Sequence, residues 1–399
     1  MWVANFFAAG SMTMVIPFIS LYIDSLGNFS EAYVQKWSGL VFAITFVTAF
    51  IFSPIWGRLG DKIGRKKILV ISASGMALSV LLMGYSTSVF QLFILRFFMG
   101  VFTGFVPMSQ AFISVQTPSN IAGKVLGTLQ TGSVTGTLMG PLLGGVLADS
   151  VGYGASFKLT SITLFVSALI VAIGIKELQL KVTDAADAVA YTSKEVIKHI
   201  VQNPMFLTVM LISMVVQVAH FSIQPILSLY VIEINGLANI ALISGITFSV
   251  AGLGNLLLAR RLGSLGDRIG YVKILIFLLF MAGIFYLPGA FVTNIWQLII
   301  LRFLVGTAIG GIIPIRVAYI REAAPLSMQG EVLGYNTSLR FLGNIAGPAL
   351  GGLIASMYGF SAVFVITSIL LILSGGVLLY IWNKHERTEK HPLPQKSSS

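Results

Sequence analysis

Residues that could do chemistry are few in this chain, and they are spread along its length. Among 399 residues there are 14 acidic residues, four histidines and no cysteine. The histidines lack the spacing of a zinc site, and no glycine-rich loop ends in the Lys-Ser/Thr pair that holds nucleotide phosphates. We therefore expect no catalytic residues, no metal and no cofactor, and the chain is not predicted to be an enzyme.

Charged side chains inside long apolar runs are the first exception. Four arginines stand in such runs, namely Arg96, Arg302, Arg316 and Arg340. A charge in hydrocarbon costs about 2.5–3.5 kcal/mol on insertion scales, so it usually faces a cavity or a partner. We interpret Arg316 as a residue of a substrate cavity; the alternative is that its side chain reaches polar headgroups.

A polar stripe is the second exception. Gln217, His220, Gln224 and Ser228 recur at spacings of three and four, which places them on one face of a helix. Histidine titrates near neutral pH. We interpret Gln217 and Gln224 as substrate-cavity residues and His220 as a candidate for the substrate or proton path. A hydrogen-bonded packing histidine is the alternative.

The elements that carry these residues are predicted to be membrane-spanning helices. The chain is 56% hydrophobic with a mean hydropathy of +0.90, and a span needs roughly 20 apolar residues. Only helices and closed barrels satisfy the backbone in lipid, and no alternation of period two is present. Twelve spans are predicted, at about 2–23, 38–56, 68–86, 90–114, 125–148, 155–175, 205–231, 239–259, 272–291, 296–319, 332–355 and 360–382.

The distribution of basic residues predicts the orientation of these spans. With both termini in the cytoplasm, 19 of the 25 Lys and Arg fall in cytoplasmic segments, two lie near the outer side and four lie within spans. This excess fits the positive-inside rule. The net charge of +11 is thus explained by topology and lipid contact, and we expect no nucleic-acid partner.

An internal repeat divides the chain into two halves. The stretch GRLGDKIGRKKIL at 57–69 returns as GSLGDRIGYVKIL at 263–275, and GTLMGPLLGG at 136–145 returns as GNIAGPALGG at 343–352. The repeat predicts an all-α protein of two pseudo-symmetric six-helix bundles. Parallel repeats of this kind are the mechanical basis of alternating access. The predicted parts are 1–178, a cytoplasmic linker at 179–203 with an amphipathic helix that follows a capping box, 204–383, and a disordered tail at 384–399.

These motifs resemble those of the major facilitator superfamily (MFS), and within it the twelve-span drug:proton antiporters. The loop 57–69 resembles the signature between spans 2 and 3. Leu92, Arg96 and Gly100 match the span-4 signature, and 136–145 matches the span-5 antiporter signature. The general look is of a Gram-positive multidrug efflux pump, and the resemblance covers about 1–382.

That resemblance implies a function. We expect a secondary active transporter of the cell membrane, a monomer that exports amphipathic drugs or toxic compounds in exchange for protons. The proton gradient would supply the energy. The alternative is an MFS carrier for one small metabolite such as a sugar, an amino acid or a siderophore.

The repeated loop is interpreted as a conformational latch. Gly57 and Gly64 permit a tight turn and close helix approach. Asp61 can lie near a helix N-terminus or pair with a cation of the other half, for which the family pattern suggests Arg340. Arg65 is expected to face anionic headgroups. Plain positive-inside anchoring is the alternative.

The latch is predicted to be one-sided, and a second gate is predicted in span 5. Asp267 repeats Asp61, but the repeat position of Arg340 is Ser133, so Asp267 lacks the matching partner. In span 5, Gly140 and its glycine neighbours four residues away permit close packing, for which span 8 is the expected partner, and Pro141 adds a kink. The alternative is ordinary helix packing.

Proton coupling is hard to place, because no acidic residue lies midway along a span. The nearest acids are Asp24 and Glu233, at the outer ends of spans 1 and 7. Burial could raise the pKa of either carboxyl, or both could be solvated loop residues. The resemblance adds Arg96 as a coupling residue. On span 1, Met14 and Phe18 could line the cavity, since methionine suits promiscuous binding, or they could be core residues.

Overall fold

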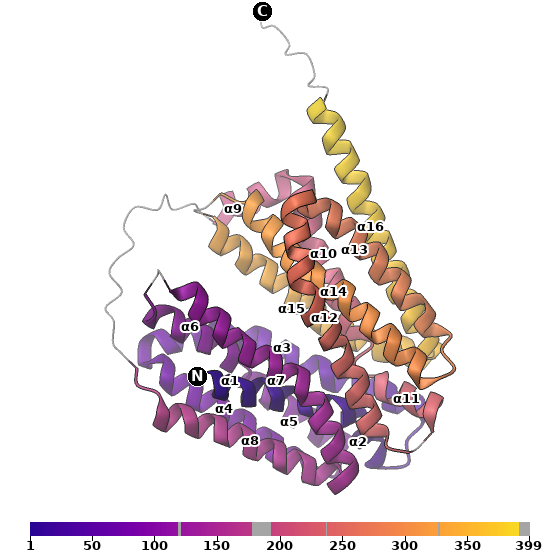
Figure 1. The fold of residues 1–399 in the computed structure, drawn as a ribbon. Helices are drawn as coiled ribbons and strands as arrows, with labels where there is room; N and C mark the ends of the chain where they lie inside the picture. The colour runs from indigo at the N-terminus through magenta and orange to yellow at the C-terminus, as the bar shows by residue number, and fades with distance from the viewer. Residues whose placement is uncertain (119–120, 178–192, 237, 326–327, 391–399) are drawn as a thin grey trace, which may run out of the picture.

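The computed structural model contains twelve helical spans in two six-span halves (Figure 1). It describes the chain apart from 119–120, 178–192, 237, 326–327 and 391–399, and within helices it leaves out some side chains, Asp61 among them. Each predicted span coincides with one of the twelve long apolar helices of the described residues. The all-α architecture predicted from composition and the repeat is therefore confirmed.

The N-terminal half begins with a broken span. Its elements are α1 (Trp2–Met14), η1 (Ile16–Phe18), α2 (Ile19–Ser25), α3 (Glu31–Ile63), α4 (Arg65–Met83), α5 (Val89–Val101), α6 (Phe105–Gln116), α7 (Ala122–Val151) and α8 (Tyr153–Gly174). The C-terminal half repeats this order, with a break in its own first span. Its elements are α10 (Pro204–Ser222), α11 (Leu227–Asn235), α12 (Ile240–Ile269), α13 (Tyr271–Tyr286), η2 (Leu287–Ala290), α14 (Ile295–Ala323), α15 (Gln329–Tyr358) and α16 (Phe360–Lys390).

The turns between helices show that the repeat extends to backbone conformation. Gly64, between α3 and α4, has φ +100°, and its repeat mate Gly270, between α12 and α13, has φ +103°. Gly152 and Gly359 close α7 and α15 with φ +83° and +81°. These φ values are strained for any residue with a Cβ. Glycine at these four positions therefore lets each helix pair reverse direction within one residue.

Between the halves lies α9 (Ser193–Gln202), where the sequence predicts an amphipathic helix. Val196 and Ile200 are buried where α9 packs on α10 and α15, whereas Ile197 and Val201 are exposed. The helix thus packs one edge of its apolar face against the C-terminal half. The rest of the predicted linker, 179–192, and the end of the predicted tail lie outside the described residues.

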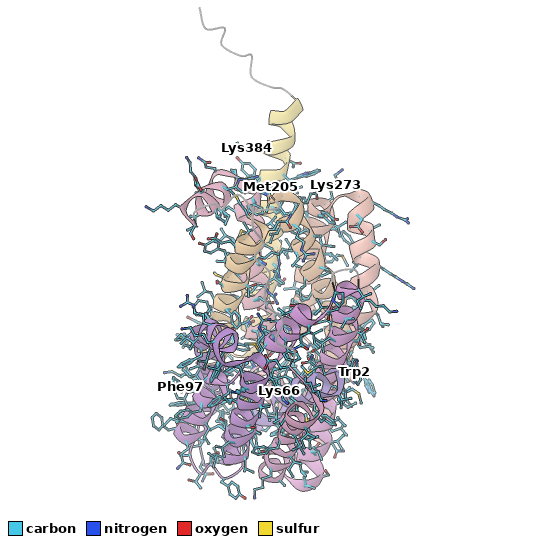
Figure 2. All side chains as sticks on the ribbon, turned by 90° about the vertical axis from the view of Figure 1, so that its left-hand side faces the viewer. Trp2, Lys66, Phe97, Met205, Lys273 and Lys384 are labelled. Atoms are coloured by element: carbon cyan, nitrogen blue, oxygen red, sulfur yellow. The ribbon has the colours of Figure 1, made fainter. Side chains whose placement is uncertain are left out.

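The halves approach each other at one end and diverge toward the other (Figure 1). We call the end with Lys66, Lys273 and Lys384 the basic end; Figure 2 looks onto it. The opposite end, with Asp24, Asp149 and Glu233, is called the closed end. Two antiparallel helix pairs, α3 with α15 and α7 with α12, form the seams between the halves.

The α3–α15 seam is tight at the closed end only. A Cβ built on Gly39 would lie 3.1 Å from Cα of Gly352, so the two backbones touch. Further along, the ring centroids of Phe50 and Phe341 are 6.1 Å apart. The same register makes Gly57 the mate of Gly334, yet a Cβ on either would meet no described atom within 4 Å.

The α7–α12 seam behaves in the same way. A Cβ on Gly145 would lie 2.9 Å from Cα of Leu242, and one on Gly245 would collide with the carbonyl oxygen of Pro141. Toward the basic end, Gly127 and Gly263 have no described atom within 4 Å of a Cβ. Both seams are therefore closed at one end and open at the other.

The glycine face of span 5 packs differently from the prediction. Gly136, Gly140 and Gly144 lie against α1, where a Cβ would collide with backbone or side-chain atoms of Phe6, Gly10, Thr13 and Met14. The predicted partner, span 8, instead contacts the neighbouring face that carries Pro141 and Gly145. Residues four apart share one helix face, so the glycine row joins two helices of one half, and the adjacent face forms the seam.

Asp149 joins the two halves at the closed end. Its carboxylate accepts hydrogen bonds from the backbone N–H groups of Ala241 (3.2 Å) and Leu242 (2.8 Å) at the start of α12. The N-cap residue of α12, Asn239, provides no side-chain cap of its own. A carboxylate from one half therefore caps a helix of the other, where the helix dipole favours negative charge.

Replacing Asp149 with Ala is expected to weaken the closed end. Loss of a cap costs about 0.5–2 kcal/mol, so the equilibrium should shift roughly 2–30-fold toward opening. The chain has no native cysteine, so spin labels at Thr87→Cys and Thr293→Cys, both exposed at this end, can report the distance across it. We expect a longer-distance population to grow.

The matched control is Ser356→Ala, since Ser356 occupies the repeat position and bonds only within α15, to Leu353. An unchanged distance distribution in Asp149→Ala would show that this cap does not hold the closed end.

Candidate functional site

The polar stripe of span 7 lies in the C-terminal half and is largely partnered. Gln217 is buried and donates to Oδ1 of Asn344 on α15 at 2.9 Å. Nε2 of His220 is 3.4 Å from Nε2 of Gln224. Ser228 donates across the halves to the carbonyl oxygen of Pro17. The stripe therefore binds helices together as well as presenting polar atoms.

A buried cation accompanies His220. Arg302 on α14 is 3% exposed and interacts electrostatically with both His220 and the hydroxyl of Tyr286 on α13. The Nδ1 atom of His220 has no hydrogen-bond partner among the described residues. His220 and Arg302 therefore interact within the C-terminal half.

Arg316 and Arg340 form a second cationic group, on α14 and α15. Arg316 is fully buried, and none of its three guanidinium nitrogens has a hydrogen-bond partner among the described residues. The positive charge of Arg340 repels that of Arg316. The Nε atom of Arg340 also has no hydrogen-bond partner among the described residues. The alternative interpretation of Arg316, a side chain that reaches polar headgroups, does not fit this burial.

In the N-terminal half, Arg96 is packed rather than paired. It is 4% exposed, its guanidinium carbon lies 5.3 Å from the ring centroid of Phe42, and one terminal nitrogen is 3.6 Å from Sδ of Met99. No carboxylate contacts it in the described part of the chain. A direct effect of Arg96 on an adjacent acid is therefore not seen in this conformation.

Asp24 and Glu233 meet at a cavity of about 240 Å³ at the closed end. Asp24 of α2 and Glu31 of α3 line it from the N-terminal half, together with Gln35, and Glu233 of α11 lines it from the C-terminal half. The carboxylates of Asp24 and Glu233 are both exposed. The structure thus brings together the two acids that the sequence singled out separately, on opposite sides of the interface that must open.

Met14 and Phe18 are core residues in this conformation. Phe18 is fully buried, with its ring centroid 5.1 Å from that of Phe157 and 5.9 Å from that of Tyr153, both on α8. Met14 is 6% exposed where α1 meets Gly144. Of the two readings open for these residues, the packing one fits the structure, because both lie inside the N-terminal half.

The loop between α3 and α4 is held by a residue that the sequence did not indicate. Glu177 accepts hydrogen bonds from the backbone N–H groups of Arg65 (2.7 Å) and Lys66 (3.3 Å), and so caps α4. The Arg65 guanidinium donates to the carbonyl oxygen of Ala111 on α6. Arg65 therefore ties α4 to α6 rather than only facing headgroups.

The two latch aspartates differ. Asp267 accepts a hydrogen bond from the Tyr271 hydroxyl at 2.6 Å, within its own half. The Asp61 side chain lies outside what is described, so its pairing with Arg340 stays a prediction.

Asp149 and Gln35 were also missed. Asp149 follows directly after the span-5 motif, and its repeat mate is the uncharged Ser356; that asymmetry was the available signal. For Gln35 the sequence contains no such signal, because its burial depends on how the two halves pack against each other. Nothing in the described residues forms a cluster of metal ligands.

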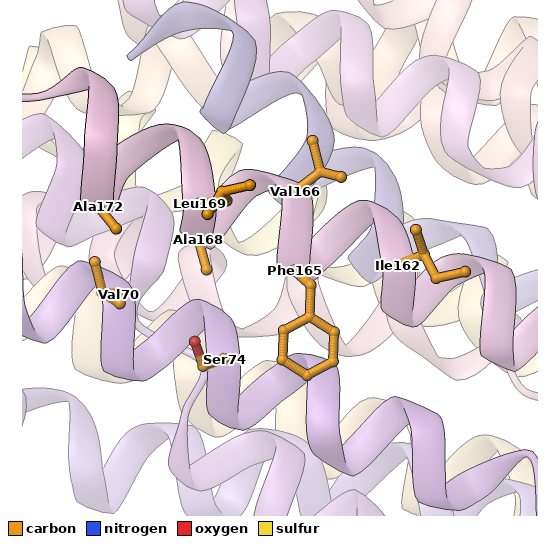
Figure 3. Close-up of a pocket in the computed structure, with 8 residues that line it drawn as sticks. All are labelled: Val70, Ser74, Ile162, Phe165, Val166, Ala168, Leu169 and Ala172. Atoms are coloured by element: carbon orange, nitrogen blue, oxygen red, sulfur yellow. The ribbon is translucent and has the colours of Figure 1, made fainter.

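A groove larger than the cavity at the closed end lies away from the candidate site residues. It has a volume of about 390 Å³ between α4 and α8 and is lined by apolar side chains apart from Ser74 (Figure 3). Two of the lining residues, Ile162 and Leu169, are more than half exposed. Acyl chains of lipid fit such a surface, and the groove contains no titratable group for the candidate site.

Glycine at 64 is expected to be required for stability. A Cβ there would adopt a strained φ and lie 2.8 Å from Oε2 of Glu177, so Gly64→Ala should lower the unfolding temperature. The control is Gly270→Ala, which has the same φ but open space around its Cβ. We expect a smaller decrease for it, measured by intrinsic fluorescence in detergent. Equal unfolding temperatures for both variants would contradict the Glu177 contact.

Comparisons with known proteins agree with this architecture. The family model described as Major Facilitator Superfamily matches residues 1–263 and 261–398. An uncharacterized MFS-type transporter of Bacillus subtilis (strain 168), YuxJ, is 52% identical over 384 residues, which cover 96% of this chain and 97% of that protein. Multidrug resistance protein MdtG of Enterobacter lignolyticus (strain SCF1) is 42% identical over 372 residues, 93% of this chain and 88% of that protein.

MdtG of Salmonella typhi is 41% identical over 387 residues, which cover 97% of this chain and 94% of that protein. Among solved structures, a bacterial homolog of the human lysosomal transporter Spinster, inward-facing and occupied, aligns with a TM-score of 0.78 at 13% identity and covers 98% of this chain and 97% of that one. Two matched halves, twelve spans and the family match together show that the chain belongs to the major facilitator superfamily and is a secondary transporter rather than an enzyme.

Proposed function

We propose that this transporter exports amphipathic drugs or toxic compounds in exchange for protons. Support comes from relatives named as multidrug resistance proteins at 41–42% identity and from the span-5 motif at 136–145, which resembles the antiporter signature. We further propose a monomer in the cell membrane with both termini in the cytoplasm, as the basic residues predict.

The observation that carries this proposal is the state of the two seams. Each is closed by backbone contact at the closed end, and each has paired glycines in open space toward the basic end. If the basic end faces the cytoplasm, this is a conformation that admits compounds from inside. Rocking the halves about their middle would close the open glycine pairs and open the other end, which is alternating access.

For the proton, Asp24 and Glu233 are the best-placed carriers. They face one cavity from opposite halves, so opening the closed end would change the solvation of both carboxyls together. Negative charges that approach one another repel, so proton uptake from outside would ease closure of this end. His220 and Arg96 are second candidates, within the separate halves.

The alternative is a carrier for one small metabolite. The hydrogen bond between Gln217 and Asn344 supports it, because fixed amides can recognise a defined polar ligand. A specific carrier would transport one chemical family, whereas the exporter would accept several unrelated apolar compounds.

Transport in liposomes separates these functions. Purified protein is reconstituted with a pH-sensitive dye inside, a proton gradient is imposed, and amphipathic dyes and drugs are added one at a time. We expect several unrelated compounds to dissipate the gradient. Asp24→Asn and Glu233→Gln should each reduce the exchange about tenfold or more, and Glu322→Gln, an exposed acid at the basic end, should not. Transport of one metabolite family alone would contradict multidrug export.

The open glycine pair gives a test of the mechanism. Gly57→Leu has room in this conformation, so the protein should fold with an unchanged unfolding temperature. In the opposite conformation the added side chain would meet Gly334, so transport should fall at least tenfold. Gly376→Leu on α16 is the matched control, since Gly376 also has open space around its Cβ but lies away from both seams. Wild-type transport by Gly57→Leu would exclude closure of this seam.

A further inference from the structure

The cavity of about 240 Å³ at the closed end is lined by acidic side chains that have no cationic partner. The carboxyl groups of Asp24, Glu31 and Glu233 line it, and none of them forms a hydrogen bond or an ion pair among the described residues. Of the 25 Lys and Arg, only Lys36 and Lys158 lie toward this end. Neither lysine pairs with a described carboxylate. The described residues therefore leave the acidic side of this cavity without a counter-charge.

Gln35 is an independent sign that the cavity receives a ligand. Its side chain lines the cavity from α3 and is only 6% exposed, yet its amide makes no hydrogen bond among the described residues. Its backbone is fixed, because the carbonyl oxygen of Gln35 lies against Gly352 in the α3–α15 seam. Burying an amide is costly unless it has a hydrogen-bond partner. A ligand with N–H groups would give the amide oxygen that partner.

The remaining wall of the cavity is apolar and indicates the kind of cation. It is made by Val34, Leu229, Ile232 and Phe360. Aliphatic and aromatic side chains accept the carbon atoms of an organic cation, and an aromatic ring attracts its charge. A bare metal ion fits less well, because the described residues contain no group of His, Cys, Asp or Glu that could hold one. Drug sites measure roughly 300–1,000 Å³, so a ligand of this smaller cavity is small.

We propose that this cavity binds a small organic ammonium compound, which holds the closed end shut. The ammonium group would donate to carboxylates of both halves and to the amide oxygen of Gln35. Asp24 and Glu31 belong to the N-terminal half and Glu233 to the C-terminal half, so the site is complete only while this end is closed. A ligand that binds one conformation better shifts the equilibrium toward it. The inference goes beyond the proposed export, because this ligand acts on the closed end and need not be transported.

The test compares two probes of similar shape that differ in charge. Full-length protein in nanodiscs of phosphatidylglycerol, a lipid without an ammonium group, is titrated with cyclohexylammonium or with neutral cyclohexanol. The ammonium probe is expected to raise the unfolding temperature, and cyclohexanol is not. With spin labels at Thr87→Cys and Thr293→Cys, the ammonium probe should also reduce the longer-distance population, measured at the pH where that population is largest.

Two variants locate the site, and neither changes a proposed proton carrier. Glu31→Gln should lower the affinity for cyclohexylammonium at least tenfold. Gln35→Leu keeps a side chain of similar size and should lower the affinity at least fivefold. Without ligand, Gln35→Leu should unfold at or above the wild-type temperature, because a buried amide without a partner is gone. The matched control is Glu322→Gln, which removes one exposed carboxylate at the basic end and should bind the probe like the wild type.

Several results would overturn the proposal. Equal responses to cyclohexylammonium and cyclohexanol would show that charge is not recognised. Unchanged affinity in both Glu31→Gln and Gln35→Leu would place the bound probe elsewhere. A marked decrease in the unfolding temperature of Gln35→Leu without ligand would show that the amide has a structural partner. Binding that leaves the closed-end distances unchanged would refute the effect on closure.

Two further arms identify the source of the cation. If Mg²⁺ alone raises the unfolding temperature as much as cyclohexylammonium does at the same concentration, the assignment to an organic cation is overturned. If phosphatidylethanolamine in the nanodisc abolishes the response to cyclohexylammonium, the ammonium group of a lipid occupies the site, and the assignment to a soluble compound is overturned. A response that persists in phosphatidylethanolamine and is absent with Mg²⁺ supports the proposal.

Discussion

Backbone contact at glycine is the interaction on which the arrangement of the two halves depends. Without a side chain at Gly39 and Gly352, or at Gly145 and Gly245, the seam helices touch main chain to main chain at the closed end. Packing this close is a main source of helix association in lipid, where the hydrophobic effect between helices is absent. Gly57 and Gly334 continue the same register into open space. One seam therefore has glycine along its length and contact along only part of it, which is what a rocking interface requires.

Acidic and basic side chains occupy different places relative to the interface between the halves. The carboxylates of Asp24, Asp149 and Glu233 lie at the closed end, where Asp149 caps α12 across the halves and the other two share a cavity. The arginines lie inside the halves, where low dielectric makes an unpaired charge expensive. The fold thus places carboxylates at the interface between the halves and arginines inside each half.

Much of this could be read from the sequence, because the features involved are local or repeated. The twelve apolar runs predict the spans, and the offset between Gly64 and Gly270 predicts two turns of the same backbone conformation. Features that depend on which helix faces which could not be predicted. The glycine row at Gly136–Gly144 packs on α1 rather than on span 8, Phe18 faces α8 rather than a cavity, and Glu177 caps α4 from more than 100 residues away. Periodicity identifies a helix face, but the neighbour of that face is set by the tertiary arrangement.

The central claim, that the two ends open alternately, is tested most directly by measuring both ends in one sample series. Spin labels at Thr128→Cys and Ser264→Cys report the basic end, and labels at Thr87→Cys and Thr293→Cys report the closed end; all four sites are exposed. Distances are measured in nanodiscs across a pH series, with and without a transported compound. The account predicts opposite changes, so that conditions that shorten the basic-end distance lengthen the closed-end distance. Distances that lengthen together, or a closed end that never opens while transport continues, would contradict it.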